Sequence, residues 1–374
     1  MRIAYIFRHH PAYPRSTKEC NSLVQAGHQV TFIGWDIQPD VDIKHEMHPD
    51  VNVALLRLAA VQRKFVFTKW LRWYWHIIKT LIKGKFDIVH CVDEYPVVMI
   101  FCFKNILFRF LIMDVYDSII KRKTNNYLTK LIFRAVRFLS NAVADRIIET
   151  SNELRDTLGR FRTKTIVLFN APPDPYVYID GIWPSPEAPL RIAATGAIDS
   201  KSMALALLLS AIDSMPSASV EVLCSGWLVD DYAKNVFAKH PAVKYTWMET
   251  QAEYYELIAL CDVVYNVRVD ADNSYYRSLV FPQKVFDALS TGRPVIVASE
   301  NWTSEWVARN KTGWSCSYKD PEALRDLLLF IKGKRTELPD YAMRCRSLYL
   351  NHYTWEIMEQ RLISLYDELN RISS

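Results

Sequence analysis

Short apolar runs alternate with longer amphipathic stretches along the whole chain, and this alternation limits the possible folds most strongly. In the first half, strand-like runs at 3–7, 29–33, 86–90, 111–115, 144–149 and 165–169 are separated by helix-like segments. A second set begins at 190–194 and continues at 220–224, 243–247, 263–267 and 295–299. The alternation predicts α/β architecture, with parallel sheets covered by helices on both faces.

The domain boundary is indicated by residues 171–189, which contain six prolines and are typical of a linker. A chain of 374 residues also exceeds the size of one ordinary core. We therefore expect a Rossmann-like N-terminal domain at 1–173 and a linker at 174–189. A second Rossmann-like domain is expected at 190–354, followed by a final helix at 355–374.

Composition points to a globular cytoplasmic protein with a basic first half. The seven cysteines are scattered and form no C-x-x-C pair, so we expect reduced thiols rather than disulfides. The opening residues run straight into a strand pattern, and we expect no signal peptide. Residues 1–173 carry 26 Lys and Arg against 15 Asp and Glu, whereas the rest carries 20 against 26. This asymmetry indicates an anionic partner for the first half.

The most chemically informative segment is a helix-like stretch that starts near residue 281. Lys284 lies at its start, Asp287 lies one turn further on, and Gly292 follows at its expected end. Free N–H groups at a helix start attract phosphate, and Lys284 adds a full positive charge. Asp287 can accept hydrogen bonds from two sugar hydroxyls. These residues describe a site for a diphosphate sugar; the alternative is a surface helix that leads into the buried strand.

This segment resembles the donor-binding helix of GT-B glycosyltransferases of family 4, in the variant P-x-K-x-F-E followed by G-x-P-V-I. The matching residues are Pro282, Lys284, Phe286, Asp287, Gly292, Pro294, Val295 and Ile296, with Asp in place of Glu. The resemblance spans nearly the whole chain. It implies a GT-B fold, in which two Rossmann-like domains face each other across a cleft and the last helix crosses back to the N-terminal domain. Leu279 stands where the commoner family pattern has a second Glu.

The resemblance also implies a set of donor-binding residues. The segment 194–203 is similar to the loop that binds the donor diphosphate, although Ala197 replaces the family's Arg. Two cations, here Lys201 and Lys284, then neutralise the pyrophosphate without a metal ion; alternatively, Lys201 is simply solvated. Trp247 or the backbone of Met248 holds the nucleotide base, unless Trp247 packs in the core. The full predicted set is Gly196, Lys201, Trp247, Met248, Tyr276, Pro282, Gln283, Lys284 and Asp287.

Acceptor-binding residues follow from three further segments of the first half. Arg15 precedes the first helix, as in a frequent opening of these transferases, which places it at the mouth of the cleft. His90 and Asp93 match the family's D-I-V-H-x-H-D segment, and Asp117 matches an acidic position beside the reacting centre, where Tyr116 replaces a His. Asp117 is the first choice for a catalytic carboxylate that orients the acceptor hydroxyl or takes its proton. Alternatively, Arg15 is solvated and His90 is structural.

A basic aromatic segment at 63–85 predicts contact with an anionic membrane surface. Trp70, Arg72, Trp73, Trp75, Lys79 and Lys83 are the predicted membrane residues. Tryptophan rings settle near lipid headgroups and Lys and Arg attract anionic lipid, whereas the many charges exclude a transmembrane span. The alternative is an ordinary domain helix whose aromatics fill the core. No nucleic-acid motif accompanies the patch.

Taken together, the resemblance implies a metal-independent retaining hexosyltransferase on the inner face of the membrane. It would move a sugar from a nucleotide diphosphate donor to a lipid-linked glycan or surface polysaccharide. We expect no cofactor and no metal, because Asp270 and Asp272 form only a short D-x-D match. Two alternatives stay open. One is a non-catalytic GT-B subunit, in view of Ala197, Leu279 and Tyr116; the other is a sugar-nucleotide epimerase or hydrolase.

Overall fold

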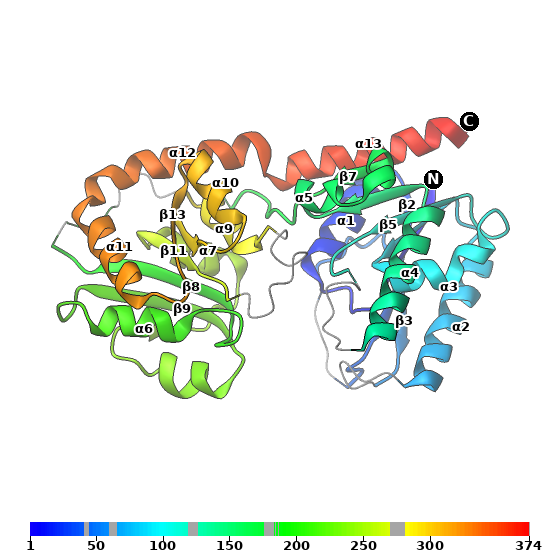
Figure 1. Ribbon diagram of the computed structural model, residues 1–374. Helices are drawn as coiled ribbons and strands as arrows, with labels where there is room; N and C mark the ends of the chain where they lie inside the picture. Colours follow the sequence, from blue (N-terminus) through cyan, green and yellow to red (C-terminus); the bar gives the residue numbers. More distant parts are fainter. Residues whose placement is uncertain are drawn as a thin grey trace. The chain divides into compact units, whose positions relative to one another are not determined.

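Parallel strands form a separate sheet in each of two compact units of the computed structural model. The N-terminal unit comprises Met1–Asn170 and Met358–Ser374, and the C-terminal unit comprises Ala171–Ile357. The structure describes residues 1–40, 45–59, 66–118, 126–175, 183, 185, 187–269 and 281–373. Figure 1 shows the elements of both units along the chain.

The N-terminal unit has a seven-stranded sheet in the order β3-β2-β1-β4-β5-β6-β7. All of its neighbouring strands pair in parallel. The strands are β1 (Arg2–Phe7), β2 (Gln29–Asp36), β3 (Asn52–Arg57), β4 (Ile88–Val92), β5 (Phe110–Asp114), β6 (Arg146–Glu149) and β7 (Thr165–Val167). The central strands β4 and β5 are buried along their whole length, as expected for a sheet covered on both faces.

Helices cover both faces of this sheet. They are α1 (Pro14–Gln25), α2 (Phe67–Gly84), α3 (Glu94–Ile100), α4 (Tyr127–Val143), α5 (Asn152–Asp156) and α13 (Trp355–Ser373), with short 3₁₀ turns at Phe101–Phe103 and Gly159–Lys164. Trp73 and Ile77 of α2 share one core cluster with Val97 of α3 and Leu111 of β5. On the other face, Glu19 of α1 and Tyr366 of α13 contact the sheet residues Tyr5 and His90. Figure 1 shows α2, α3 and α4 grouped together.

The C-terminal unit has a six-stranded sheet in the order β10-β9-β8-β11-β12-β13, again all parallel. Its strands are β8 (Leu190–Ile198), β9 (Val220–Leu228), β10 (Val243–Tyr245), β11 (Val263–Asn266), β12 (Val295–Ala298) and β13 (Gly313–Cys316). Its helices are α6 (Leu205–Asp213), α7 (Gln251–Ala259), α9 (Gln283–Ser290), α10 (Thr303–Asn310), α11 (Pro321–Gly333) and α12 (Leu338–His352), with short turns at Ala233–Phe237 and Arg335–Glu337. Two parallel α/β sheets are the architecture that the apolar alternation predicts.

Candidate functional site

The start of helix α9 and the end of strand β8 meet in the C-terminal unit. Pro282 is the N-cap of α9 and Lys284 is its second residue. Gly196, near the end of β8, adopts a φ of 82°, which favours glycine. A methyl group built on Gly196 would lie 2.9 Å from Cε and 3.5 Å from Nζ of Lys284. The structure thus brings together two residues of the predicted donor-binding set.

Gly226 completes this close approach and is a residue that sequence reasoning missed. It pairs in register with Gly196 across β8 and β9 and has a φ of 131°. A methyl group on Gly226 would lie 2.0 Å from the carbonyl oxygen of Gly196. Only glycine fits at this position. Because neither glycine has a side chain, the two strands can approach each other closely and Lys284 can lie against Gly196. The signal in the sequence was a lone glycine two residues after the strand-like run 220–224.

The charge of Lys284 is poorly neutralised by the surrounding protein. Burial, and to a lesser extent the positive charge of Arg268, lowers its pKa to about 8, while Asp287 acts in the opposite direction. Among the described residues, none accepts a hydrogen bond from its ammonium or forms an ion pair with it within 4.0 Å. Two cations that repel each other beside a helix start form an anion-binding environment.

Asp287 lies deeper in the same helix and is held by two tyrosines. Its side chain is buried, and its two oxygens accept hydrogen bonds from the hydroxyls of Tyr254 at 2.9 Å and Tyr255 at 3.4 Å. The Tyr254 hydroxyl also lies 3.1 Å from that of Thr195, the residue before Gly196. Sequence reasoning missed these partners on α7 and β8. They connect Asp287 to the end of β8, where Gly196 lies against Lys284.

The remaining predicted donor residues have more open surroundings. The side chain of Lys201 is exposed. Trp247 is 50% exposed and stacks on Trp227, which is 70% exposed, with ring centroids 6.4 Å apart. Because the Trp247 ring is on the surface, core packing does not explain it. Met248 is half-buried, and Gln283 is exposed at the start of α9. Tyr276 and Leu279 lie outside the described residues.

In the N-terminal unit, Asp93 organises the loop that carries Asp117. The Asp93 carboxylate accepts hydrogen bonds from the backbone N–H groups of Tyr116 and Asp117, both at 2.9 Å. Asp93 itself has a φ of 64°, an uncommon conformation for a residue with a side chain. Asp117 is exposed at the end of the strand β5. Two of the predicted acceptor residues are therefore directly connected.

Arg15 and His90 lie in a buried network rather than at a surface. Arg15 is 2% exposed and donates hydrogen bonds to Glu19 and Asp114, both at 2.8 Å. His90 is fully buried, and its Nδ1 lies 2.8 Å from the hydroxyl of Tyr366. This corrects the prediction that Arg15 contacts the acceptor or a phosphate, because Glu19 and Asp114 enclose its guanidinium. The burial of His90 favours its structural alternative.

The network also includes Tyr116. Its hydroxyl lies 2.6 Å from that of Tyr5, which in turn donates to Glu19 at 2.7 Å. The guanidinium of Arg15 lies over its ring, 4.4 Å from the centroid. Tyr116 therefore connects the Asp117 loop to the buried ion pairs. Its phenol hydroxyl is hydrogen-bonded within the protein.

Three residues of this network, in the part of the chain that the structure describes, are close enough together to bind a metal ion. Ligand atoms of Glu19, His90 and Asp114 lie within 4.8 Å of one another. Arg15 already supplies a positive charge to both carboxylates at 2.8 Å. Burial raises the pKa of Asp114 well above its usual range and lowers that of His90 to about 4. A shared proton on Asp114, facing Nε2 of His90 at 3.4 Å, gives a neutral cluster.

The asparagine variant of Asp93 tests whether this carboxyl group is protonated in the folded protein. Burial, helped by the negative charge of Glu94, raises the pKa of Asp93 to about 7. In the unfolded chain this pKa is about 4. Between pH 4 and pH 7, Asp93 is therefore protonated in the folded protein but ionised in the unfolded chain. The free energy of unfolding decreases as the pH rises through this range.

Asp93→Asn keeps the carbonyl oxygen for both N–H groups and tolerates a positive φ. Three pKa units correspond to about 4 kcal/mol, so we expect the variant to melt about 8–16 °C higher than the wild type at pH 8, and at the same temperature at pH 4. Thermal unfolding at the two pH values measures this, with Asp117→Asn as the exposed control. A variant that melts lower at both pH values would show that the carboxylate charge stabilises the loop.

Helix α2 divides the predicted membrane residues between core and surface. Trp73 is fully buried and stacks on Trp35, which corrects its assignment to the membrane. Trp70 is half-buried and lies beneath the guanidinium of Arg8, 5.0 Å from the ring centroid. Trp75 is 64% exposed. The exposed basic residues of the set are Arg72, Lys79 and Lys83. In the described part of the chain, the helices are too short or too polar to cross a bilayer.

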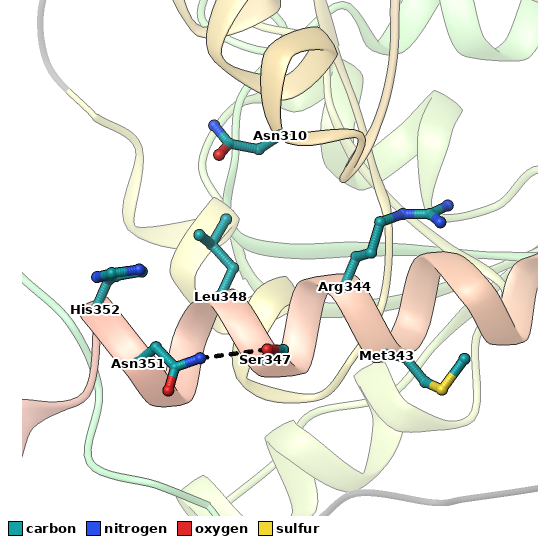
Figure 2. Close-up of a pocket in the computed structure, with 7 residues that line it drawn as sticks. All are labelled: Asn310, Met343, Arg344, Ser347, Leu348, Asn351 and His352. Atoms are coloured by element: carbon teal, nitrogen blue, oxygen red, sulfur yellow. Dashed lines mark hydrogen bonds between the residues drawn. The ribbon is translucent and has the colours of Figure 1, made fainter.

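A hollow of about 410 Å³ lies along helix α12 (Figure 2). Its lining residues are Asn310, Met343, Arg344, Ser347, Leu348, Asn351 and His352. Most of these side chains are exposed, and the Arg344 guanidinium already donates to the carbonyl of Lys311 at 3.2 Å. None of the predicted site residues lines it. The candidate site is therefore the Lys284 region and not this hollow.

Comparison with known proteins supplies the fold. No protein-family model matches the sequence, and no curated protein matches it either. Many solved structures are similar in fold, and three of them are similar over nearly their whole length. Sucrose-phosphate synthase from Thermosynechococcus elongatus has a TM-score of 0.77 at 15% identity, with 100% of both chains covered.

The second is Anabaena HepE in complex with UDP-glucose, with a TM-score of 0.70 at 12% identity, covering 98% of this chain and 100% of that one. The third is the lipopolysaccharide outer core galactosyltransferase WaaB in its apo form. It has a TM-score of 0.65 at 12% identity, covering 98% of this chain and 99% of that one. Together with the two parallel sheets, these similarities establish the GT-B fold that the sequence predicted.

Proposed function

We propose that this chain is a glycosyltransferase of the family 4 type that uses a nucleoside diphosphate sugar as donor. One observation carries the proposal: the ammonium of Lys284 lies at the start of α9, against Gly196 and near the second cation Arg268. A diphosphate would supply negative charge to the ammonium of Lys284. The GT-B fold supports the same donor class, since HepE was solved with UDP-glucose.

In the proposed reaction, the bond between the sugar's anomeric carbon and the diphosphate breaks as the acceptor oxygen bonds to the same face. The acceptor proton passes to the departing diphosphate, and the anomeric configuration is retained. Lys284, Arg268 and the N-terminus of α9 stabilise the charge that develops on the leaving group, so that no metal ion is required. Exposed Lys201 contributes less, because water screens its charge.

Residues of the C-terminal unit would position the donor, and residues of the N-terminal unit would position the acceptor. On the donor side, Asp287 and its tyrosine partners fix the start of α9 and accept ribose hydroxyls, while Trp247 stacks on the base. Exposed Asp117, held by Asp93, would orient the acceptor hydroxyl. Each of these roles is a proposal that follows from the contacts described above.

We propose a lipid-linked glycan or a surface polysaccharide as acceptor, and the cytoplasmic face of an anionic membrane as location. The exposed Arg72, Trp75, Lys79 and Lys83 of α2 suit such a surface. The galactosyltransferase WaaB, by its name, acts on lipopolysaccharide. Both observations favour an acceptor anchored in or near a membrane.

A panel of nucleotide sugars tests this function. The wild-type protein is incubated with each sugar nucleotide and a lipid-linked glycan extract, and free nucleoside diphosphate is measured over time. We expect one donor to be consumed in an extract-dependent manner, with no loss of activity in EDTA. If no donor yields diphosphate above the protein-free control, the transferase proposal is wrong.

A non-catalytic GT-B subunit is the second candidate, and one observation favours it. The hydroxyl of Tyr116, at the position where the resembled pattern has histidine, donates its proton to Tyr5, whose own proton goes to Glu19, so it has no proton to offer a substrate. This candidate predicts that the protein binds a partner or membrane but no nucleotide sugar. Diphosphate binding that depends on Lys284 would exclude it.

A further inference from the structure

Helix α4 turns an apolar face to the outside of the N-terminal unit. Six of its large apolar side chains are between 38% and 79% exposed: Tyr127, Leu128, Leu131, Ile132, Phe138 and Leu139. At 100° per residue these positions occupy one continuous stripe of the helix. We call this stripe the α4 apolar face.

The polar side of α4 points inward and fixes the rotation of the helix. Arg137 is buried and donates to Glu94 of α3 at 3.1 Å, and it also bonds to Glu149 of β6. Ser140 and Asn141 are buried on the same side. Rolling the apolar face inward would break these buried ion pairs, so the outward orientation is built into the fold.

The surroundings of the α4 apolar face are basic. Neither α4 nor α2 contains an Asp or Glu residue. Lys130 and Arg134 of α4 are exposed beside the face. Helix α2 repeats the combination, because exposed Phe67, Leu71 and Trp75 lie near exposed Arg72 and Lys79. Apolar stripes on helices that carry cations and no acidic residue match a bilayer surface that contains anionic lipid.

The position of the two helices brings this surface to the acceptor end of the unit. Helix α2 follows β3 and α4 follows β5, so both begin at the edge where the parallel strands end. Asp93 and Asp117 lie at that edge, after β4 and β5. Both helices belong to the layer that contains α3 (Figure 1). A bilayer against this layer would lie beside the acceptor residues.

We infer that the α4 apolar face, supported by α2, is a docking surface for an anionic lipid bilayer. It deepens the proposed membrane association and rests on that part of the proposed function. A second copy of the chain fits less well, because a symmetric contact through this face would pair two α4 helices that carry cations and no acidic residue. The inferred surface makes α4, rather than α2, the main anchor.

Vesicle flotation of the full-length protein tests this inference. Wild-type protein and variants are mixed with phosphatidylcholine vesicles with and without phosphatidylglycerol, at low and high salt. Leu128→Glu/Ile132→Glu places two charges one helical turn apart on the α4 apolar face. We expect the wild type to float with anionic vesicles only, and this variant to lose affinity roughly a hundredfold.

Matched variants separate the possible outcomes. Leu71→Glu/Trp75→Glu in α2 should weaken binding less, by about tenfold. Leu329→Glu/Phe330→Glu alters two exposed apolar residues of α11 in the C-terminal unit, and should bind like the wild type. Circular dichroism and thermal unfolding should show all three variants folded, because the altered side chains are exposed.

The inference is overturned if the α4 variant floats like the wild type, or if only the α2 variant is impaired. It is also overturned if light scattering shows a wild-type dimer that the α4 variant converts to a monomer. A wild type that never floats removes the membrane association itself. None of these results alters nucleotide release in solution, so failure of the transferase proposal would be seen separately.

Discussion

Replacing Lys284 with methionine is expected to weaken nucleoside diphosphate binding about a hundredfold or more. A charge-assisted hydrogen bond to phosphate contributes about 1.5–3 kcal/mol, and Lys284 supplies at least one of these in a partly dry site. Methionine keeps an unbranched side chain against Gly196, so the packing between α9 and β8 should survive. Calorimetric titration of both proteins with the diphosphate that binds best measures the loss.

Lys201→Met is the matched control for this substitution. Lys201 is exposed, so its charge is screened by water and its removal should change affinity by no more than about fivefold. An equal loss in the two variants would mean that the cations act as a pair, as the family pattern implies. Unchanged binding in Lys284→Met would place the diphosphate elsewhere.

Arg15→Met is expected to destabilise the N-terminal unit by about 3–5 kcal/mol, the largest loss of stability we predict. The substitution leaves Glu19 buried and charged, next to Asp114, with no cation within bonding distance among the described residues. Urea unfolding followed by a probe of the N-terminal unit measures the change. Arg155→Met is the control, because Arg155 forms only a surface ion pair with Asp156 and should change stability by less than about 1 kcal/mol.

A double variant distinguishes a charge effect from a packing effect. Arg15→Met/Glu19→Met removes both charges, and Asp114 is uncharged because burial raises its pKa. We expect the double variant to recover a large part of the lost stability. If Arg15→Met instead leaves stability unchanged and lowers only acceptor-dependent turnover, Arg15 acts on the substrate as the sequence predicted.

The sequence was most informative where residues that act together are also close together in the sequence. Apolar runs predicted the buried strands, but two edge strands were missed, β3 and β13. Most residues of β3 are only half-buried although it contains a short apolar run, and β13, with the sequence GWSC, has no continuous apolar run. The Lys284 segment was found because its charges, helix start and following strand lie within a few residues of one another.

Long-range partners were beyond the reach of sequence reasoning. Arg15 resembled a cleft residue because nothing nearby shows that Asp114, 99 residues later, accepts its hydrogen bond. The two tyrosines that hold Asp287 come from another helix. Amphipathic periodicity finds an apolar face but cannot tell which way it points. Helix α4 illustrates this, since Arg137 turns its polar side toward the sheet and leaves the apolar side exposed.

The central claim is that Lys284 receives the diphosphate of a nucleotide donor, and proton-counting calorimetry tests it most directly. The wild-type protein is titrated at pH 8 with UDP, GDP, TDP and ADP in two buffers of different ionisation enthalpy. With a pKa of about 8, Lys284 is half-deprotonated in the free protein, and a bound diphosphate raises this pKa. We predict that one diphosphate binds at a single site and takes up about half a proton at pH 8, and almost none at pH 6. Absence of binding by all four, or binding at pH 8 without proton uptake, would contradict the claim.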